Sequence, residues 1–327
     1  MTPPTTTLRL REVYDGWDRW LHFSVDPRAF ALYRIALGVL FVLDLILSAP
    51  FVETWWTDAG VLPLVHHKLF APQAAITVFE WLPNSTALVW TCWKIALIQG
   101  LCLIAGVATR FQLASVLMWA ASFDYRNGMI LDGGDKIFRL LLFFLLFAPA
   151  AEVWSVDASW KRRRGVAPRQ SVDGWVLRLI QLQMCIALWS AGVEKLDGAQ
   201  WRDGTAMYYI MNLDDFALHG PVPNVFRTSL AWSHLFTWGS LSIELGAPIL
   251  IWFQETRRWA LVAIVLLHLS IEYVMSIYMF EWIMLLGWMS HASCSDFDEL
   301  RNFGQRAFRQ VRRAGRAATT TPLSESR

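Results

Sequence analysis

Long runs of apolar residues, separated by short polar or turn-rich breaks, occupy most of the chain between residues 30 and 291. A transmembrane helix needs about 20 predominantly apolar residues, so each run is a candidate membrane span. The pattern predicts about eight spans, over residues 30–49, 87–108, 111–125, 136–151, 174–195, 231–253, 257–275 and 277–291. Asp26 and Pro27 before the first run are a typical helix cap and first-turn residue. The sequence therefore predicts an all-α polytopic membrane protein.

The composition agrees with a chain that is dissolved mainly in lipid. Of its 327 residues, 55% are hydrophobic and only 17% are charged, whereas soluble globular proteins carry about 25% charged residues. These values argue against a cytosolic enzyme and exclude a disordered chain or a disulfide scaffold. The four cysteines form no CxxC or metal-ligand spacing and are interpreted as small apolar packing residues.

The distribution of Lys and Arg predicts the orientation. Nineteen of these cations fall in one set of alternate connections, which includes both ends of the chain, and six fall in the other set. Positively charged loops remain in the cytoplasm, so both termini are predicted to be cytoplasmic in a multi-pass protein of the inner (plasma) membrane. The predicted domains are a cytoplasmic segment over 1–29, a transmembrane domain over 30–295 and a basic, partly disordered cytoplasmic tail over 296–327. The tail is expected to lie on anionic lipid or to be solvated.

Ionisable side chains inside apolar spans are costly and usually face a bundle interior or a cavity, so they are candidates for function. These residues are Arg34, Asp44, Lys94, Arg139, Arg178, Glu194, Lys195, Glu244, His268, Glu272 and Glu281. Asp44, Lys94 and Arg178 are interpreted as structural, through snorkelling or pairing across helices.

Lys195 ends the fifth predicted span, directly after Glu194 and two residues before Asp197. Burial disfavours the charged form of a lysine, which makes its amine a usable base near neutral pH. The alternative is structural, because a cation at the end of a helix complements the helix dipole or pairs with a neighbouring carboxylate. The spacing alone favours neither interpretation.

A glycine-rich segment over residues 123–135 carries Arg126, Asp132 and Asp135 among other polar residues. Glycine lets the backbone approach a ligand closely, and these acids are placed to orient a base or to pair with the arginine. No metal site is expected, because His66 and His67 are interpreted as solvated loop residues. The sequence has no phosphate loop, no hydrolase or metalloprotease motif and no nucleic-acid module, so no nucleic-acid partner is expected.

Several short motifs occur along the chain in a fixed order. They are Asp26-Pro27-Arg28, Thr57-Asp58-Ala59-Gly60-Val61-Leu62-Pro63, Trp154-Ser155-Val156-Asp157, Ala191-Gly192-Val193-Glu194-Lys195-Leu196-Asp197 with Trp201, and His268 followed by Met279-Phe280-Glu281-Trp282. Together they resemble the HTTM family, bacterial membrane proteins that are similar to the membrane domain of vitamin K-dependent gamma-glutamyl carboxylase. The resemblance covers nearly all of residues 20–295.

The resemblance implies a chemistry and a site. The carboxylase oxygenates a reduced vitamin K hydroquinone, and the strong base so produced removes a glutamate gamma proton before carbon dioxide adds. In that family the lysine before Leu-Asp is the proposed base for the hydroquinone, and the matching residue is Lys195. The implied cofactor is a reduced vitamin K-like quinone. The residues expected to bind substrate are His268, Asp132, Asp135, Arg126, Asp197, Trp201, Met279 and Phe280.

This chain departs from the family's pattern in places. Glu194 stands where the animal carboxylase has a second lysine, and a carboxylate there favours a charged Lys195 unless it faces elsewhere. A histidine of the animal enzyme falls at about Gly134, so its role does not carry over. The large domain that recognises the substrate propeptide of the animal carboxylase has no match here, so the quinol half of the chemistry is expected without processive carboxylation.

Three hypotheses follow. The first is a membrane-embedded carboxylase-like or epoxidase-like enzyme with Lys195 as base, acting on an isoprenoid quinol. The second is a non-enzymatic membrane protein that binds a lipid, a quinone or a small peptide for maturation or immunity. The third, a secondary transporter, ranks lowest because the sequence shows no inverted repeat. The expected partners are therefore the lipid membrane, an isoprenoid quinol and a small peptide substrate.

Overall fold

The structure, a computed structural model, describes residues 6–70, 75–83, 85–213, 222–275 and 277–292. Ser290 ends the first of two compact units, and the second unit begins at His291. The predicted tail over 296–327 and Cys294 lie outside the described residues.

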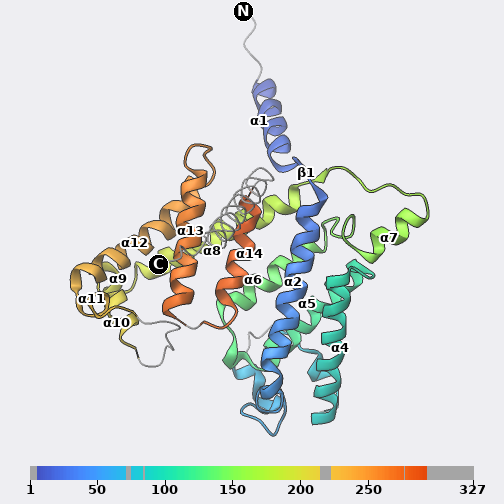
Figure 1. The fold of residues 1–327 in the computed structure, drawn as a ribbon, viewed down its shortest axis with the longest axis horizontal. Helices are drawn as coiled ribbons and strands as arrows, with labels where there is room; N and C mark the ends of the chain where they lie inside the picture. Colours follow the sequence, from blue (N-terminus) through green and yellow to red (C-terminus); the bar gives the residue numbers. More distant parts are fainter. Residues whose placement is uncertain (1–5, 71–74, 84, 214–221, 276, 293–327) are drawn as a thin grey trace, which may run out of the picture. The chain divides into compact units, whose positions relative to one another are not determined.

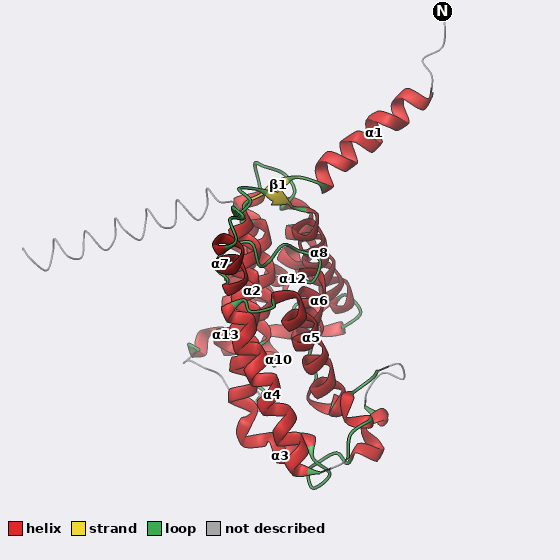
Figure 2. Ribbon diagram, turned by 90° about the vertical axis from the view of Figure 1, so that its right-hand side faces the viewer, coloured by secondary structure: helices red, strands yellow, loops and turns green. Residues whose placement is uncertain are grey.

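The described chain is helical almost throughout, with one short strand pair (Figures 1 and 2). The α-helices are α1 (Thr6–Leu21), α2 (Pro27–Ser48), α3 (Val52–Trp56), α4 (Thr86–Ala105), α5 (Thr109–Arg126), α6 (Gly133–Leu145), α7 (Val156–Arg163), α8 (Trp175–Lys195), α9 (Ala199–Arg202), α10 (Ala206–Met211), α11 (Asn224–Thr228), α12 (Leu230–Leu250), α13 (Arg257–Val274) and α14 (Phe280–Trp288). The strands are β1 (Ser24–Val25) and β2 (Val172–Asp173), and the short 3-10 helices are Ala49–Phe51, Leu64–Leu69, Val78–Glu80, Gly128–Ile130 and Met289–His291.

Each of the eight predicted spans overlaps one of the longer helices, which are α2, α4, α5, α6, α8, α12, α13 and α14. Within the described residues, three helical segments are long and apolar enough to cross a membrane: Pro27–Trp56, Thr86–Ala105 and Trp175–Lys195. The predicted fold class is therefore confirmed as far as a mostly helical chain with candidate membrane-spanning helices. The count of eight spans and the cytoplasmic termini stay predictions.

Two of the helices differ in their bounds from the predicted spans. The span over 136–151 extends past the end of α6 at Leu145, and the span over 277–291 begins before α14, which starts at Phe280. Tyr278, just before α14, has a φ of 36°, a left-handed conformation that interrupts a helix in a non-glycine residue. Hydropathy does not detect such a break because the residues around it remain apolar.

The strand pair joins the starts of two distant helices. β1 and β2 are antiparallel, with Ser24 opposite Asp173 and Val25 opposite Val172, and the helices α2 and α8 follow these strands directly. Arg178, on the first turn of α8, donates a hydrogen bond to the carbonyl of Trp20 at 3.2 Å. The beginnings of α2 and α8 are therefore fixed at the same end of the bundle.

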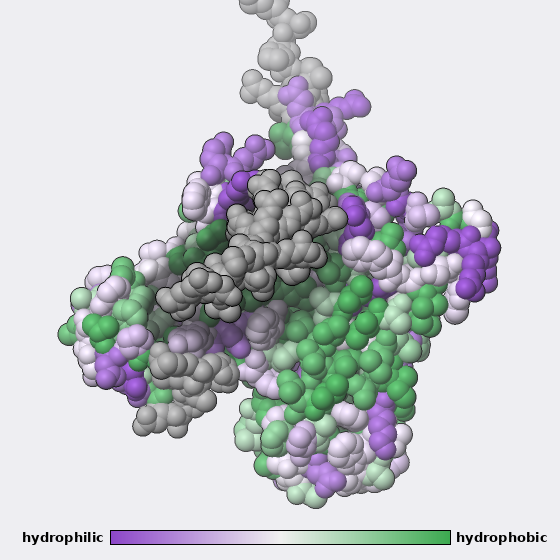
Figure 3. Space-filling model, in the orientation of Figure 1, coloured by the Kyte–Doolittle hydropathy of each residue, from purple (hydrophilic) through white to green (hydrophobic). Residues whose placement is uncertain are grey.

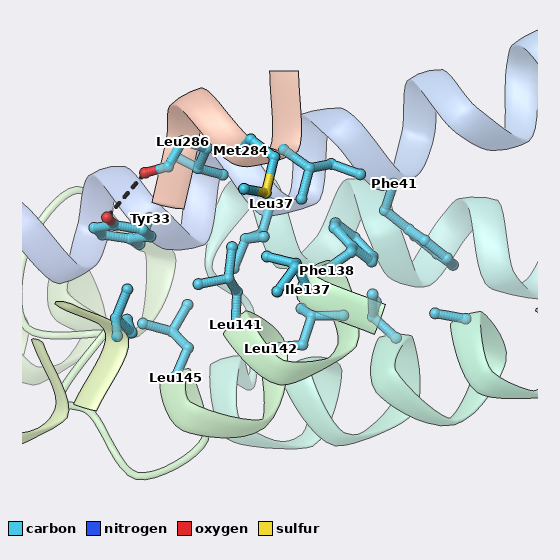
Figure 4. Packing of buried hydrophobic residues seen from close by; sticks show 14 of the residues in the cluster. Tyr33, Leu37, Phe41, Ile137, Phe138, Leu141, Leu142, Leu145, Met284 and Leu286 are labelled. Atoms are coloured by element: carbon cyan, nitrogen blue, oxygen red, sulfur yellow. Dashed lines mark hydrogen bonds between the residues drawn. The ribbon is translucent and has the colours of Figure 1, made fainter. Parts of the chain in front are cut away.

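The hydrophobic core extends over most of the long helices, and Figure 4 shows the part that lies between α2, α6 and α14. Leu37 of α2, with Leu141 and Leu145 of α6, is fully buried. The hydroxyl of Tyr33 donates to the carbonyl of Leu286 at 2.9 Å, so the one polar group of this ring is satisfied inside the core.

Small residues let α2 and α4 approach closely. A Cβ atom at Gly38 would lie 2.7 Å from a side-chain carbon of Ile104, and one at Gly100 would lie 2.8 Å from Val42. Close backbone approach through small residues is a common way to pack helices in lipid. The outer faces of the same helices expose apolar side chains, which form a green area over α2 and α4 in Figure 3. They include Leu43, Ile46, Leu47, Ile98 and Leu101.

The Trp154-to-Asp157 motif has a structural role at the end of the bundle where α4 ends and α5 begins. The Asp157 carboxylate accepts hydrogen bonds from the backbone N–H groups of Ala108 at 2.9 Å and Thr109 at 2.8 Å. The buried guanidinium of Arg34 donates to the carbonyl of Trp154 at 2.5 Å. This motif therefore caps α5 and ties the α6–α7 connection to α2.

Candidate functional site

Lys195, the sequence-predicted base, forms an ion pair with Glu244 that joins the C-terminal end of α8 to α12. A Cβ atom at Gly192, one turn earlier, would lie 3.1 Å from the Cβ of Glu244. The absence of a side chain at Gly192 thus allows the two helices to come close enough for the pair. The Lys195 ammonium also lies 4.9 Å from the centre of the Trp201 ring, where the ring face attracts a cation.

The two members of this pair differ in access. The side chain of Glu244 is 3% exposed, whereas that of Lys195 is 28% exposed. The second carboxylate oxygen of Glu244, Oε2, is buried and has no hydrogen-bond partner among the described residues. A ligand can therefore reach Lys195, and Oε2 of its buried partner Glu244 can still accept a hydrogen bond.

Among the described residues, neither Glu194 nor Asp197 forms an ion pair with Lys195, and both side chains are exposed. The structural alternative predicted from the sequence, a pair with one of these neighbours, is thus replaced by a pair with Glu244 on another helix. Asp197, a predicted substrate-binding residue, lies in the turn after α8, where its backbone N–H donates to the carbonyl of Glu194 at 3.3 Å.

His268, another predicted site residue, is buried between α13 and α14. Its Nδ1 contacts Oε2 of Glu281, and its Nε2 accepts a hydrogen bond from the indole N–H of Trp288 at 3.2 Å. Both ring nitrogens are therefore used inside the protein. The other oxygen of Glu281, Oε1, is buried without a hydrogen-bond partner among the described residues.

The helices that carry the Lys195 pair and the His268 pair pack against one another. Glu281 interacts with the charges of Lys195 and Glu272 as well as with His268. Four helices, α8, α12, α13 and α14, thus each contribute an ionisable group to one polar cluster within the bundle. We call the set Lys195, Glu244, His268 and Glu281 the lysine cluster.

A separate cavity of about 300 Å³ lies between α2, α5, α6 and α14. Three predicted site residues, Asp132, Asp135 and Met279, line it. The sequence analysis did not predict the other polar residues of the cavity wall to be site residues. The hydroxyl of Tyr278 donates to Oδ1 of Asp44 at 3.0 Å across this wall, and aromatic residues cover much of the remainder.

The acids of the glycine-rich segment also build the local backbone. Asp132 accepts hydrogen bonds from the N–H groups of Gly134 and Asp135, and Asp135 accepts one from the N–H of Asp132 at 2.9 Å. This reciprocal capping box starts α6. Phe280 packs against the two glycines of this turn, since a Cβ atom at Gly134 would lie 3.1 Å from the Cα of Phe280. No side chain larger than hydrogen fits at Gly134 without a shift of the backbone.

Arg126 lies outside both groups. It is 1% exposed and donates to the carbonyl of Leu62 at 2.7 Å and to Asp58 at 3.0 Å. It therefore anchors the loop that contains the motif from Thr57 to Pro63.

No group of three or more metal-ligating side chains occurs among the described residues. His67, interpreted from the sequence as solvated, is buried and contacts Glu80 through Nε2 at 2.8 Å. Hydrogen bonds from Lys68 and then His67 hold the pKa of Glu80 below its ordinary value. Cys92, Cys102 and Cys185 are free thiols.

The sequence did contain a signal for the missed members of the site. Glu244, Glu281 and Asp44 are ionisable residues in apolar runs, but the pattern does not show which of them face each other. Trp288 and Tyr278 carry no charge, so only the fold identifies them as hydrogen-bond donors to the site residues.

Comparison with known proteins gives relatives over most of the chain. The HTTM domain matches residues 23–293. Sporulation-delaying protein SdpB of Bacillus subtilis (strain 168) is 27% identical over 247 residues, which is 73% of each chain. The uncharacterized protein YitO of the same organism is 22% identical over 180 residues, which is 54% of this chain and 56% of YitO. The match thus spans little more than half the length of YitO. No solved structure matches the chain significantly.

Proposed function

Because this chain belongs to the HTTM domain family, we propose that it is a multi-pass protein of the inner (plasma) membrane that acts on a reduced quinone with Lys195 as the base. It oxygenates the quinone to an epoxide or couples that step to carboxylation of a small substrate. One observation carries the proposal: the lysine that matches the family's proposed base is accessible and is paired with a buried carboxylate.

The proposed topology has eight spans and both termini in the cytoplasm. The excess of Lys and Arg in alternate connections supports this orientation. At a rise of 1.5 Å per residue, α6 and α14 are only about 20 Å and 14 Å long, compared with a hydrocarbon core of about 30 Å. In this topology, α6 and α14 span the hydrocarbon core only together with the irregular backbone at their ends. Irregular backbone at membrane depth is tolerated where protein surrounds it.

The residues of the lysine cluster fit a phenolic substrate that loses a proton. In the ion pair Lys195 holds the proton and Glu244 is charged. In the proposed step Glu244 takes this proton and leaves Lys195 as a neutral amine. The Nζ atom then takes the proton of a substrate hydroxyl, and the re-formed ammonium stabilises the negative oxygen. Dioxygen, in the family's chemistry, supplies the epoxide oxygen and leaves its second oxygen as water.

Trp201 and the exposed part of Lys195 define where a quinone head is bound in this proposal. A planar ring can stack near the indole and present its hydroxyl to Nζ, while an isoprenoid tail remains in lipid. His268 holds Glu281 in place beside this site, since both of its ring nitrogens are occupied.

The test is oxygen-dependent consumption of a reduced menaquinone by the protein reconstituted in lipid nanodiscs. Lys195→Ala and Glu244→Gln should each lower the rate by 100-fold or more, the typical contribution of a general base. Glu194→Gln is the matched control, because Glu194 is adjacent to Lys195 but exposed, and it should retain the rate of the unmodified protein. Equal rates in all four proteins would reject the enzymatic role of Lys195.

A second candidate is binding without turnover, which the cavity favours. This cavity of about 300 Å³ is lined by aromatic and acidic residues, and Lys195 does not line it. In this candidate a lipid, quinone or small peptide is held for maturation or immunity. Ala120→Leu, which fills part of the cavity wall, should abolish binding of a fluorescent menaquinone analogue, whereas Lys195→Ala should leave binding unchanged. The opposite pattern would reject this candidate.

A further inference from the structure

A wide basic hollow lies where α5 begins, separate from the lysine cluster and the cavity. Its volume is about 640 Å³, and its walls are the start of α5, the turn after α6, helix α7 and the loop that follows α7. Four cations and two large aromatic side chains line it: Arg110, Lys161, Arg164, Arg169, Phe111 and Trp160.

The acidic groups of this hollow are already satisfied. Glu152 pairs with Lys161 at 3.1 Å, and Asp157 accepts the two backbone N–H groups at the start of α5. Within the described part of the chain, no carboxylate pairs with Arg110, Arg164 or Arg169. The hollow therefore carries three guanidinium groups whose charge is not compensated.

The aromatic residues place the hollow at the edge of the apolar region. Phe111 is 62% exposed and Trp160 is 52% exposed, although each lies beside an arginine or lysine. Exposed aromatic rings next to cations are typical of the boundary between lipid and water. The apolar outer face of α4 ends at Ala105, only a few residues before Arg110, so the cations lie at the level where headgroups are expected.

We propose that this hollow binds the phosphate headgroup of an anionic lipid. Arg110, Arg164 and Arg169 contact the phosphate oxygens, to which a guanidinium donates two parallel hydrogen bonds. Phe111 and Trp160 contact the upper part of the acyl chains. Free phosphate offers the same oxygens but has no acyl chain to contact the aromatic rings. The lining of the hollow therefore favours a lipid over free phosphate. The inference does not depend on whether Lys195 is catalytic.

The experiment measures lipid binding by native mass spectrometry on the detergent-purified full chain. The protein is titrated with dioleoyl phosphatidylglycerol and, separately, with dioleoyl phosphatidylcholine. Each cation near a headgroup contributes about fivefold in affinity, so Arg110→Gln with Arg164→Gln should weaken phosphatidylglycerol binding roughly thirtyfold. These side chains are exposed, so the thermal stability of the double variant should equal that of the unmodified protein.

The matched control removes the same number of charges from the same region. Arg162 and Arg163 lie on α7 but line a different hollow, so Arg162→Gln with Arg163→Gln should leave phosphatidylglycerol affinity within about twofold. Equal losses in the two double variants would overturn the site in favour of general surface attraction. Equal affinity for phosphatidylcholine would overturn the anionic headgroup. Displacement of the lipid by inorganic phosphate at the same concentration would show a free-phosphate site and overturn the lipid assignment.

Discussion

The indole nitrogen of Trp288 lies 3.2 Å from Nε2 of His268, and because an indole N–H can only donate, this nitrogen of His268 is the acceptor. The proton of the neutral imidazole therefore lies on Nδ1, which contacts Glu281. Glu281 is fully buried, and His268 is 2% exposed. Through its two ring nitrogens, His268 of α13 thus makes two polar contacts with α14 inside the core.

Loss of the His268–Glu281 contact should destabilise the fold. His268→Leu leaves the Glu281 carboxyl buried without its hydrogen-bond partner, and such a loss costs roughly 1 to 3 kcal/mol of unfolding free energy. The measurement is thermal unfolding of the purified protein in detergent, followed by circular dichroism. Ser270→Ala on the same helix is the control, because within the described residues its hydroxyl bonds only to the carbonyl of Leu267. A loss for His268→Leu no larger than that of the control would contradict the role assigned to this contact.

The Lys195–Glu244 pair should behave as a coupled unit in stability as well. Lys195→Met leaves the Glu244 carboxylate buried without a cation, and Glu244→Met leaves the ammonium beside an apolar neighbour. We expect each single variant to lose about 2 kcal/mol or less, because Lys195 is partly solvated, and the double variant to regain most of this loss. Unfolding free energies of the four proteins form the cycle. Additive losses in the double variant would mean that the two side chains do not interact.

Much of the helical architecture follows from the sequence. The run over 30–49 is continuous and apolar and is preceded by an Asp-Pro cap, so it predicts α2 to within a few residues. Lys195 and His268 are also identifiable, because a charge in an apolar run is costly and needs a reason. The pattern cannot show that Lys195 faces Glu244, since that contact depends on Gly192 and on the packing of α8 against α12.

The division of the predicted site into two groups could not be found from the sequence either. Asp132 and Met279 line the cavity, whereas Lys195 belongs to the lysine cluster. Two consecutive residues of α14 contact different parts of the protein: Phe280 packs on Gly134 at the start of α6, whereas Glu281 contacts His268 of α13. Periodicity shows which residues share a helix face, but the neighbours of that face are set by tertiary packing.

The carboxylate of Asp157 should contribute to stability without affecting the lysine cluster. Asp157→Ala removes the acceptor for two backbone N–H groups at the start of α5, and loss of an N-terminal cap costs about 1 to 2 kcal/mol. Asp157→Asn keeps one acceptor oxygen and should lose about half as much. Thermal unfolding gives the stabilities, and menaquinol consumption at a temperature well below unfolding should be the same for all three proteins. A selective loss of turnover in Asp157→Ala would point to a functional rather than a capping role.

Stability of the strand pair should depend on pH through His22. Its Nδ1 lies 2.6 Å from Asp173 in β2, and the hydrogen bond to Asp173 raises the pKa of His22 above its ordinary value of 6.5, with a smaller contribution from the charge of Asp18. A histidine whose pKa is raised in the folded state contributes stability in full below the unfolded value of 6.5. That contribution is lost as pH rises through the folded-state pKa.

Hydrogen exchange at the Gly174 amide, which donates to the carbonyl of Phe23 at 2.8 Å, reports on this strand pair. After correction for intrinsic exchange, the protection factor should be higher at pH 5.5 than at pH 8.5 in the unmodified protein, and the difference should shrink in high salt because the pair is exposed. In His22→Gln the protection should be the same at both pH values. Asp15→Asn, which removes an exposed acid from α1, should retain the full pH dependence. A pH-independent protection factor in the unmodified protein would be incompatible with a His22–Asp173 contact that strengthens when His22 is charged.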